Sequence, residues 1–314
     1  MADNMIRSIL GVISLFLYAL TTVLLAVTIL CVSLIVCIIP VRKWRFAIQK
    51  NFLQRTPSWY STINSLIMRI NTSGKWDILG TGQLQKNNWY VMISNHRSWL
   101  DILVLDRVFN KKIPPLKFFM KKELLWQLPF AGLACYALGY PFMSRHSHAA
   151  IRKNPQLKGQ DVATTKKACQ RLRHFPTTLI NFLEGTRFTE KKKERQQSPF
   201  QHLLKPHAGG IAVVMHELQD ILAGVVSVTI CYPNKTPSVW EFVCGRFEKI
   251  VVRYELLPIT PDLIGDYYDD RNFRAHMQQW LNEIWKKNDV MIEEQILQKP
   301  ACSERSERNK GVLQ

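Results

Sequence analysis

The sequence predicts an α/β fold in which a mainly parallel, mixed sheet is flanked by helices, with a membrane helix or hairpin at the N-terminus. From residue 76 onward, short apolar runs alternate with stretches of helical period, as in parallel sheets. The 34 residues from Ser8 to Val41 carry no charge. Asp3 and Arg7 cancel each other, so the whole formal charge of +18 lies on residues 42–314.

The uncharged N-terminal segment is the first predicted element. As a helix it would be about 51 Å long, against a hydrocarbon core of about 30 Å. It is too long for a simple span and too short for two full ones, so a tilted single helix and a shallow hairpin both remain open. Five basic residues follow it closely, namely Arg42, Lys43, Arg45, Lys50 and Arg55. This asymmetry places the rest of the chain in the cytoplasm.

Four regions are expected. Residues 1–41 form the anchor, 42–75 form interfacial amphipathic helices, 76–299 form a catalytic domain, and 300–314 form a disordered tail. The second region mixes aromatic with basic side chains, although a surface helix packed on the domain would show the same pattern. A further set of basic and aromatic side chains could contact a surface of anionic lipid or form a face exposed to solvent. These are Lys111, Lys112, Lys117, Phe118, Phe119, Lys121, Lys122 and Trp126.

The remaining elements follow from the alternation of apolar runs. We expect strands at Trp89–Ser94, Leu138–Met143, Thr178–Leu183, Ile221–Tyr232, Val239–Cys244 and Phe247–Leu257. We expect helices at Trp99–Phe109, Lys121–Ala137, Asp161–His174, His207–Leu218 and Asp270–Gln298. The polar run Glu190–Gln197 is expected to be an exposed loop.

The first expected strand runs into the sequence NHRSWLD, which puts His96 in a loop and Asp101 in the first turn of a helix. By itself this pattern favours a capping box, in which Ser98 and Asp101 satisfy the backbone at the helix start. The same geometry also suits a catalytic pair. The carboxylate would accept a hydrogen from one imidazole nitrogen and leave the other nitrogen facing a cleft as a base.

Two further strand ends carry polar groups, and ligands of open α/β sheets collect at the carboxyl ends of strands. One ends at Arg145, and the other ends in Glu184, Gly185, Thr186 and Arg187. A guanidinium group fits a phosphate through two hydrogen bonds, which predicts a phosphate site. The alternative is that Arg145 and Arg187 are ordinary surface residues paired with acids.

Taken together, these motifs resemble the glycerolipid acyltransferases, which are defined by NHxxxxD and EGTR motifs about 90 residues apart. The first motif runs here from Asn95 to Asp101 and the second from Glu184 to Arg187. The resemblance covers roughly residues 40–260, and the 1-acylglycerol-3-phosphate acyltransferases are the most similar branch. The strand GVVSVTICYP departs from the family because its proline, Pro233, comes only after the strand. This departure bears on which acceptor head group is favoured.

The resemblance implies a role for each matching residue. His96 would be the general base on the acceptor hydroxyl, and Asp101 would orient it. Arg145 would bind the acceptor phosphate, and the second motif would shape the same site. The acceptor-phosphate group is thus Arg145, Glu184, Gly185, Thr186, Arg187 and Lys205.

The implied partners are an acyl-CoA or acyl carrier protein donor, a lysophospholipid acceptor and anionic membrane lipids. No cysteine pair has metal-ligand or redox spacing, so we expect no metal and no other cofactor. The expected location is a bacterial inner membrane, with the catalytic domain on its cytoplasmic face. Two alternatives remain: a phospholipid–lysophospholipid transacylase, and a basic membrane-tethered binding module. No nucleic-acid-binding motif stands out, so we expect no nucleic acid partner.

Overall fold

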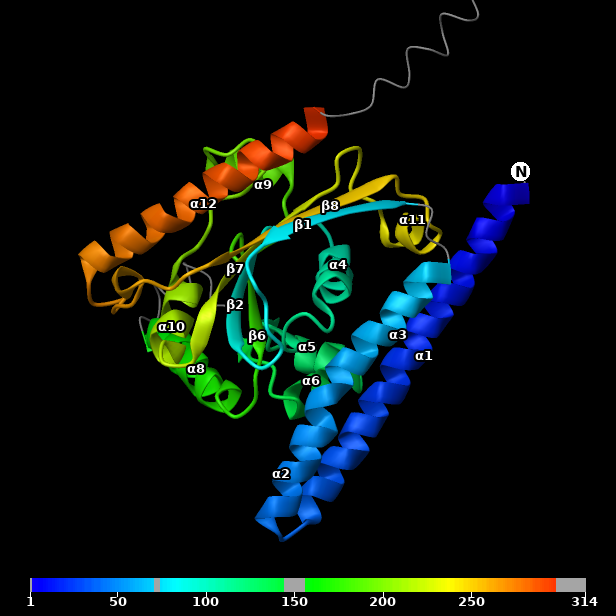
Figure 1. The fold of residues 1–314 in the computed structure, drawn as a ribbon, viewed down its shortest axis with the longest axis horizontal. Coiled ribbons are helices and arrows are strands. Elements are labelled where there is room, and N and C mark those ends of the chain that lie inside the picture. Colours follow the sequence, from blue (N-terminus) through cyan, green and yellow to red (C-terminus); the bar gives the residue numbers. More distant parts are fainter. Residues whose placement is uncertain (1, 71–73, 144–155, 298–314) are drawn as a thin grey trace, which may run out of the picture.

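A computed structural model describes residues 2–70, 74–143 and 156–297, and it contains a six-stranded sheet with helices on both faces (Figure 1). The strands lie in the order β1–β8–β7–β2–β6–β3. All neighbours are parallel except β7 and β8, which are antiparallel. The predicted mainly parallel, mixed sheet is therefore confirmed.

The strands of this sheet are β1 (Lys75–Thr81), β2 (Trp89–Ser94), β3 (Leu116–Phe118), β6 (Thr178–Phe182), β7 (Leu222–Cys231) and β8 (Lys249–Leu257). A separate parallel pair consists of β4 (Met120–Lys121) and β5 (Phe142–Met143). The helices are α1 (Ala2–Ile38), α2 (Arg42–Asn51), α3 (Thr56–Ile70), α4 (Leu100–Phe109), α5 (Leu124–Gln127), α6 (Ala131–Ala137), α8 (Gln156–Leu172), α9 (Glu190–Gln196), α10 (Gly209–Leu218), α11 (Val239–Val243) and α12 (Arg271–Leu297). Two 3₁₀ turns are η1 (Leu53–Arg55) and η2 (Pro261–Leu263).

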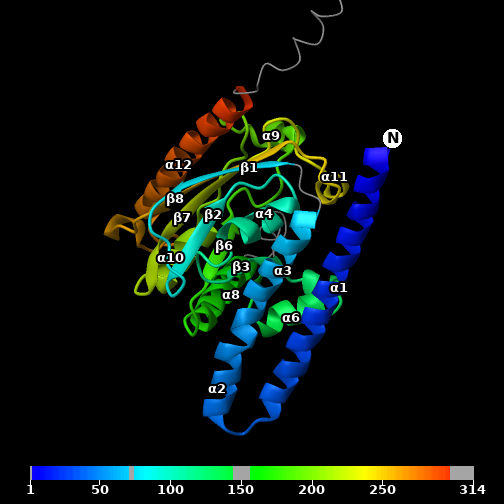
Figure 2. The ribbon, with the colours of Figure 1, turned by 45° about the vertical axis from the view of Figure 1, so that its right-hand side comes forward.

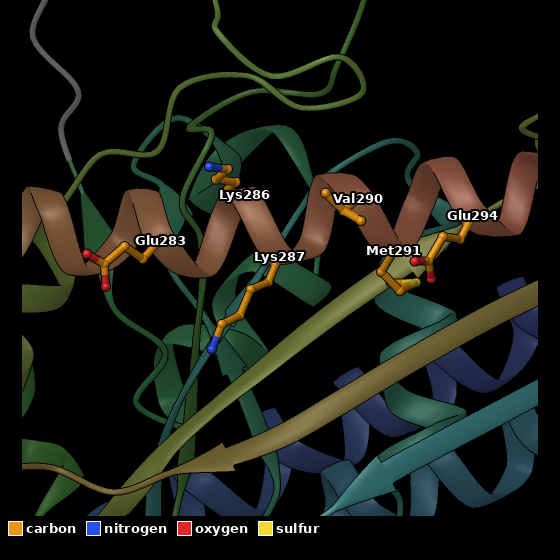
Figure 3. A pocket seen from close by; sticks show the side chains of 6 residues that line it. All are labelled: Glu283, Lys286, Lys287, Val290, Met291 and Glu294. Atoms are coloured by element: carbon orange, nitrogen blue, oxygen red, sulfur yellow. The ribbon is translucent and has the colours of Figure 1, made fainter.

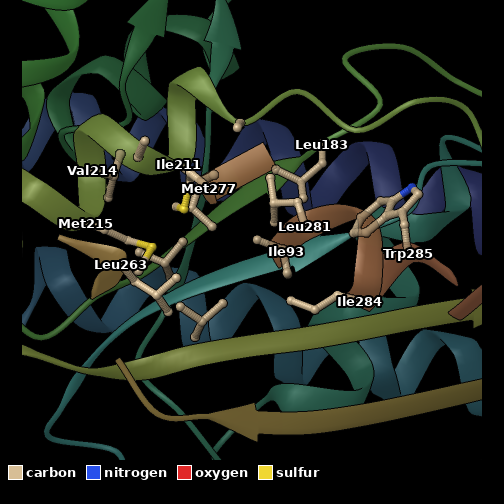
Figure 4. Close-up of a cluster of buried hydrophobic side chains, with 14 of the residues drawn as sticks. Ile93, Leu183, Ile211, Val214, Met215, Leu263, Met277, Leu281, Ile284 and Trp285 are labelled. Carbon is tan, nitrogen blue, oxygen red and sulfur yellow. The ribbon is translucent and has the colours of Figure 1, made fainter. Parts of the chain in front are cut away.

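The central strand β2 is buried on both faces, and its side chains alternate between two cores. Val91 and Ile93 pack under α8, α10 and α12, in the cluster shown in Figure 4. Tyr90 and Met92 pack on the opposite face, under α3 and α4. This double burial holds the end of β2, from which the NHRSWLD segment continues, in a fixed place.

The apolar N-terminal segment is one continuous helix, α1, so a hairpin within that segment is wrong. The helix is long and apolar enough to cross a membrane by length and composition, and 17% of its most apolar window is buried. It runs beside α3 and reaches α11 near the N-terminus (Figures 1 and 2). At that end, Arg246 donates hydrogen bonds to the carbonyl of Asn4 and to Oγ of Ser8.

Two local expectations were wrong because side-chain caps start helices that are too short to have a recognisable helical period. The expected strand at Val239–Cys244 is α11, which begins with a capping box between Ser238 and Glu241. The expected loop at Glu190–Gln197 contains α9, where the hydroxyl of Thr189 accepts a hydrogen bond from the backbone of Lys192. Neither helix offers a sustained helical period, so sequence periodicity could not reveal them.

The predicted bounds of the helix and strand around Pro129 also differ from the structure. The helix expected at Lys121–Ala137 is divided into α5 and α6, because Leu128 before Pro129 is extended. The strand expected at Leu138–Met143 is reduced to the two residues of β5, which follow α6. Strands β1 and β3 lie at the two sheet edges and were not expected.

An open hollow runs along α12 (Figure 3). Its lining consists of Glu283, Lys286, Lys287, Val290, Met291 and Glu294. None of the predicted site residues lines it, so the hollow does not identify the site.

Candidate active site

The carboxyl ends of β2, β6 and β7 meet at one edge of the sheet, because these three strands are parallel neighbours (Figure 2). Ser94 at the end of β2 pairs with Phe182 on one side and with Val228 on the other. His96 lies two residues beyond Ser94, and Glu184 lies two residues beyond Phe182. The strand ends therefore bring the two sequence motifs together.

The carboxylate of Asp101 is the centre of the site, and this residue is fully buried. Its Oδ2 lies 2.8 Å from Nδ1 of His96 and also accepts the backbone N–H groups of Arg97 (2.6 Å) and Ser98 (2.8 Å). Its Oδ1 accepts the hydroxyl hydrogen of Tyr232 at 2.8 Å. This carboxylate therefore forms the His–Asp pair and one half of the predicted capping box, because it accepts the N–H of Ser98. The other half is missing, because the N–H of Asp101 bonds to the carbonyl of Ser98 and not to its hydroxyl.

The ring of His96 is held from several directions. Its face stacks on Phe182, with centroids 4.1 Å apart and an interplanar angle of 16°. Its backbone N–H donates to Oε1 of Glu184 (3.2 Å), and its carbonyl accepts from the N–H of Phe188 (2.8 Å). With Nδ1 directed at the carboxylate, Nε2 makes no hydrogen bond to a residue in the described ranges. The side chain is 14% exposed, so Nε2 is the nitrogen available to a substrate.

Asn95 fixes the loop that carries His96 to the neighbouring strand. Its amide Nδ2 donates to the carbonyl of Ile230 (2.9 Å), and its Oδ1 accepts the N–H of the same residue (2.8 Å). The side chain thereby pairs with β7 in the way a strand backbone would. The asparagine of the NH pair thus ties the His96 loop to the sheet, and it is buried.

Glu184 lies beneath the loop and is also buried. Its two oxygens accept the backbone N–H groups of His96 and Leu204 (3.3 Å). Burial raises the pKa of Glu184 to about 8, although these hydrogen bonds and the charge of Arg97 oppose the shift. This residue therefore supports the His96 loop and does not face a phosphate from the surface.

The turn after Glu184 is built by Gly185, whose φ of +66° is a conformation that favours glycine. The hydroxyl of Thr186 accepts a hydrogen bond from Nζ of Lys192 (2.7 Å), and the carbonyl of Arg187 accepts from the same ammonium (2.8 Å). The exposed guanidinium of Arg187 lies over the ring of Trp99, 4.9 Å from its centroid. The guanidinium of Arg187 therefore lies beside Trp99, at the start of the helix that carries Asp101.

Other predicted residues differ in their placement. Lys205 is exposed and directly follows Leu204. Arg145 lies outside the described residues. Lys117, which was expected on a lipid-facing or solvated surface, is 3% exposed, and its Nζ donates to Oε1 of Gln54 at 3.4 Å. Burial lowers the pKa of Lys117 to about 8, so its assignment to the surface was wrong.

Sequence reasoning missed Tyr232 and Arg97. Tyr232 directly follows β7, so the strand-end rule that found the other motifs could have found it. Arg97 lies within NHRSWLD, with its guanidinium 4.5 Å from the ring centroid of Phe188 and a 3.0 Å hydrogen bond to the carbonyl of His202. No sequence signal linked it to that distant segment. Within the described ranges, no three His, Cys, Asp or Glu side chains are grouped as a metal site.

The fold and this strand-edge arrangement define an α/β protein with a partly exposed His–Asp pair at the carboxyl ends of its parallel strands. The chain belongs to the acyltransferase family, whose model matches residues 76–232. It is 28% identical over 201 residues to 1-acyl-sn-glycerol-3-phosphate acyltransferase 3 of Arabidopsis thaliana, covering 57% of this chain and 50% of that protein. It is 25% identical over 218 residues to the human 1-acyl-sn-glycerol-3-phosphate acyltransferase delta, covering 65% and 52%. The chain thus spans about half the length of these relatives.

The fold is also similar to a solved structure. The 1-acyl-sn-glycerophosphate acyltransferase PlsC of Thermotoga maritima aligns with a TM-score of 0.56 at 14% sequence identity. The alignment covers 93% of this chain and 98% of the other. At this identity, the likeness establishes the fold alone.

Proposed function

We propose that this protein transfers a fatty acyl chain from a thioester, on coenzyme A or acyl carrier protein, to the free hydroxyl of a lysophospholipid. The preferred acceptor is 1-acylglycerol-3-phosphate, and the product is phosphatidate. Membership of the acyltransferase family and the names of its relatives support this proposal. The observation that carries it is the 2.8 Å contact between His96 Nδ1 and Asp101, which leaves Nε2 directed to a substrate.

The reaction needs no protein nucleophile, because the acceptor brings its own hydroxyl. Nε2 of His96 removes the hydroxyl proton as the oxygen attacks the thioester carbonyl carbon. The C–S bond of the tetrahedral intermediate then breaks, and His96 returns the proton to the departing thiolate. Asp101 keeps the hydrogen on Nδ1 before the reaction and stabilises the imidazolium during it. The N–H groups of Arg97 and Ser98 are already used by Asp101, so the oxyanion is stabilised by other donors.

Arg187 and Lys205 are the exposed cations that we assign to the acceptor phosphate, together with Arg145. Thr186 and Gly185 shape the turn that presents Arg187, and Glu184 supports it from below. The guanidinium lies over the ring of Trp99, a contact that limits the positions of its paired donors. Loss of one of these cations is expected to raise the KM for a phosphate-bearing acceptor more than the KM for the donor.

The apolar surface of the N-terminal helices supports a membrane location, and the basic residues that follow α1 favour the cytoplasmic side. Exposed apolar side chains lie along α1, on α6, which packs against α1, and on α5, which packs against α6. On α1 they include Ile9, Val12, Phe16, Leu20, Leu24 and Val27, and on α5, α6 and their junction they are Trp126, Leu128, Phe130, Leu133 and Tyr136. Such a contiguous surface fits lipid. We propose that residues 1–41 are the anchor, that 42–75 form the interfacial helices and that 76–299 form the catalytic domain.

The test is an acylation assay with purified protein in lipid–detergent micelles. Lysophosphatidate, lysophosphatidylinositol and lysophosphatidylcholine are each offered with an acyl-CoA, with an acyl carrier protein thioester, or with no thioester. We expect phosphatidate to form from lysophosphatidate only when a thioester is present. Product without a thioester would instead identify a transacylase, and no acylated product in any arm would reject acyl transfer.

A further inference from the structure

We infer that Asp289, on the C-terminal helix α12, is a positioning residue for the active site. It acts on the segment from Gln201 to Leu204, which in turn contacts the His96 loop. The inference rests on the proposed function for its kinetic consequence. The residue lies outside the stretch 76–232 that matches the family model.

The carboxylate of Asp289 binds two successive backbone groups. Its Oδ2 accepts the N–H of Gln201 and its Oδ1 accepts the N–H of His202, each at 2.7 Å. One turn further along α12, Glu293 pairs with Nε2 of His202. Two acidic side chains at i and i+4 therefore hold one short segment by its backbone and by a side chain.

The segment held in this way reaches the active site at two points. The carbonyl of His202 accepts the hydrogen bond from Arg97, which is the residue directly after His96. Two residues later, the N–H of Leu204 donates to Glu184, whose other oxygen binds the backbone of His96. The positions of Arg97 and Glu184, which both adjoin His96, thus depend on the position of this segment.

The helix is a firm support for this contact. Its inner face buries Met277, Leu281, Trp285 and Ile292 in the core shared with Ile93 of β2 (Figure 4). The same core includes Leu203 of the held segment. The helix, the strand and the segment are therefore packed together. The two hydrogen bonds from Asp289 fix the position of the segment along α12.

A merely structural role for Asp289 predicts a loss of stability alone, whereas a positioning role predicts slower chemistry in the folded protein. Displacement of catalytic groups by about 1 Å can cost about 10²-fold in rate. We expect Asp289→Ala to lower kcat at least about tenfold while the KM for each substrate stays within about threefold. Asp289→Asn retains one acceptor and should recover part of the rate.

Asp270 provides the matched control, because it also accepts two backbone N–H groups, those of Asn272 and Phe273, at the opposite end of α12. Asp270→Ala should lower the unfolding temperature and leave kcat of the folded protein unchanged. Amide hydrogen exchange of residues 198–206, which does not depend on activity, should quicken in Asp289→Ala and stay slow in Asp270→Ala.

The outcomes separate this inference from the proposed function. An inactive wild-type protein would reject the function, and the exchange experiment would still decide the placement of the segment. An active wild type with Asp289→Ala at normal kcat would overturn the positioning role. If Asp289→Ala fails to fold, Asp289→Asn decides: normal kcat in that variant, with unchanged exchange, overturns the inference.

Discussion

The hydroxyl of Tyr232 donates a hydrogen bond of 2.8 Å to Oδ1 of Asp101, the oxygen that does not contact His96. Burial, together with the negative charge of Asp101, holds the pKa of Tyr232 well above its ordinary value. The phenol is therefore a neutral donor at any physiological pH. It completes the hydrogen bonding of a carboxylate that has no access to water, and it fixes the orientation in which Oδ2 meets the imidazole.

Replacement of Tyr232 by Phe removes this donor and leaves a buried carboxylate oxygen without a partner. We expect a loss of about 1–3 kcal/mol in the free energy of unfolding. We also expect kcat to fall by about tenfold, equivalent to about 1.4 kcal/mol in the barrier. Denaturant unfolding and initial rates measure the two effects. Tyr90→Phe is the control, because Tyr90 is a buried tyrosine at the far end of β2. Equal rates in the two variants would refute a role for Tyr232 in the site.

Asp101→Asn tests whether the carboxylate sets the tautomer of His96. An amide presents a single acceptor oxygen, so it cannot satisfy Tyr232, two backbone N–H groups and the imidazole together. With an amide N–H toward Nδ1, the ring hydrogen moves to Nε2 and the base is lost. We expect kcat to fall by about 10²–10⁴-fold with little change in the acceptor KM. A large rise in KM with normal kcat would contradict this role.

The raised pKa of Glu184 makes stability depend on pH. The folded protein binds the Glu184 proton up to a pH of about 8, whereas the unfolded chain releases it near 4.5. Stability should therefore decline as the pH rises from about 4.5 to about 8 and then level off. Buried Asp106, with its pKa raised to about 7 by burial, acts in the same direction. The Glu184→Gln variant, which keeps one acceptor oxygen, should have a shallower slope.

Thermal unfolding between pH 5 and pH 9 provides the measurement for this slope. Asp106→Asn should remove the part of the pH dependence that Asp106 contributes. The double variant Glu184→Gln and Asp106→Asn should therefore have the smallest change in unfolding temperature with pH. The carboxylates of Asp77 and Glu241, whose pKa values are lowered to about 2, stay ionised throughout this range and add no slope. An unfolding temperature that rises with pH across the range would be incompatible with a buried Glu184.

Lipid binding by the outer surface of α1 and α6 can be tested by vesicle flotation. The double variant Phe16→Ser and Phe130→Ser places two hydroxyls on that surface and should weaken binding to vesicles of mixed neutral and anionic lipid. Val290→Ser is the control, because Val290 is 53% exposed but lies on α12, away from α1. Equal loss in both variants, or in neither, would argue against this membrane face.

Much of the fold follows from patterns visible in the sequence. Strand β2 has the bounds that its apolar run predicts, and β6 and β7 agree to within one residue. The convergence of His96 and Glu184 follows from the parallel order of β2 and β6. The short helices α9 and α11 were not predicted, because side-chain caps at Thr189 and Ser238 start them. Neither helix is long enough to have a periodic buried face that the sequence would reveal.

The site residues could be predicted where they follow the carboxyl ends of neighbouring strands. They could not be predicted where the fold brings together residues that are far apart in the sequence. His96 and Asp101 are local in sequence, so their spacing revealed them. Tyr232 lies 131 residues from Asp101 and Asp289 lies 87 from His202, and neither forms a motif with its partner. Lys117 lies in a basic run, but in β3 its side chain is buried and its Nζ donates to Oε1 of Gln54 in η1.

The central claim is that His96 acts as the base, and His96→Ala tests it most directly in the lysophosphatidate acylation assay. General-base catalysis is typically worth about 10²–10⁴-fold, so kcat should fall by that factor. Vesicle binding should stay close to that of the wild type. The unfolding temperature should fall only modestly when the ring stacked on Phe182 is lost, because Oδ2 of Asp101 keeps the N–H groups of Arg97 and Ser98. A variant that folds, binds vesicles and turns over within about threefold of the wild-type rate would contradict the account.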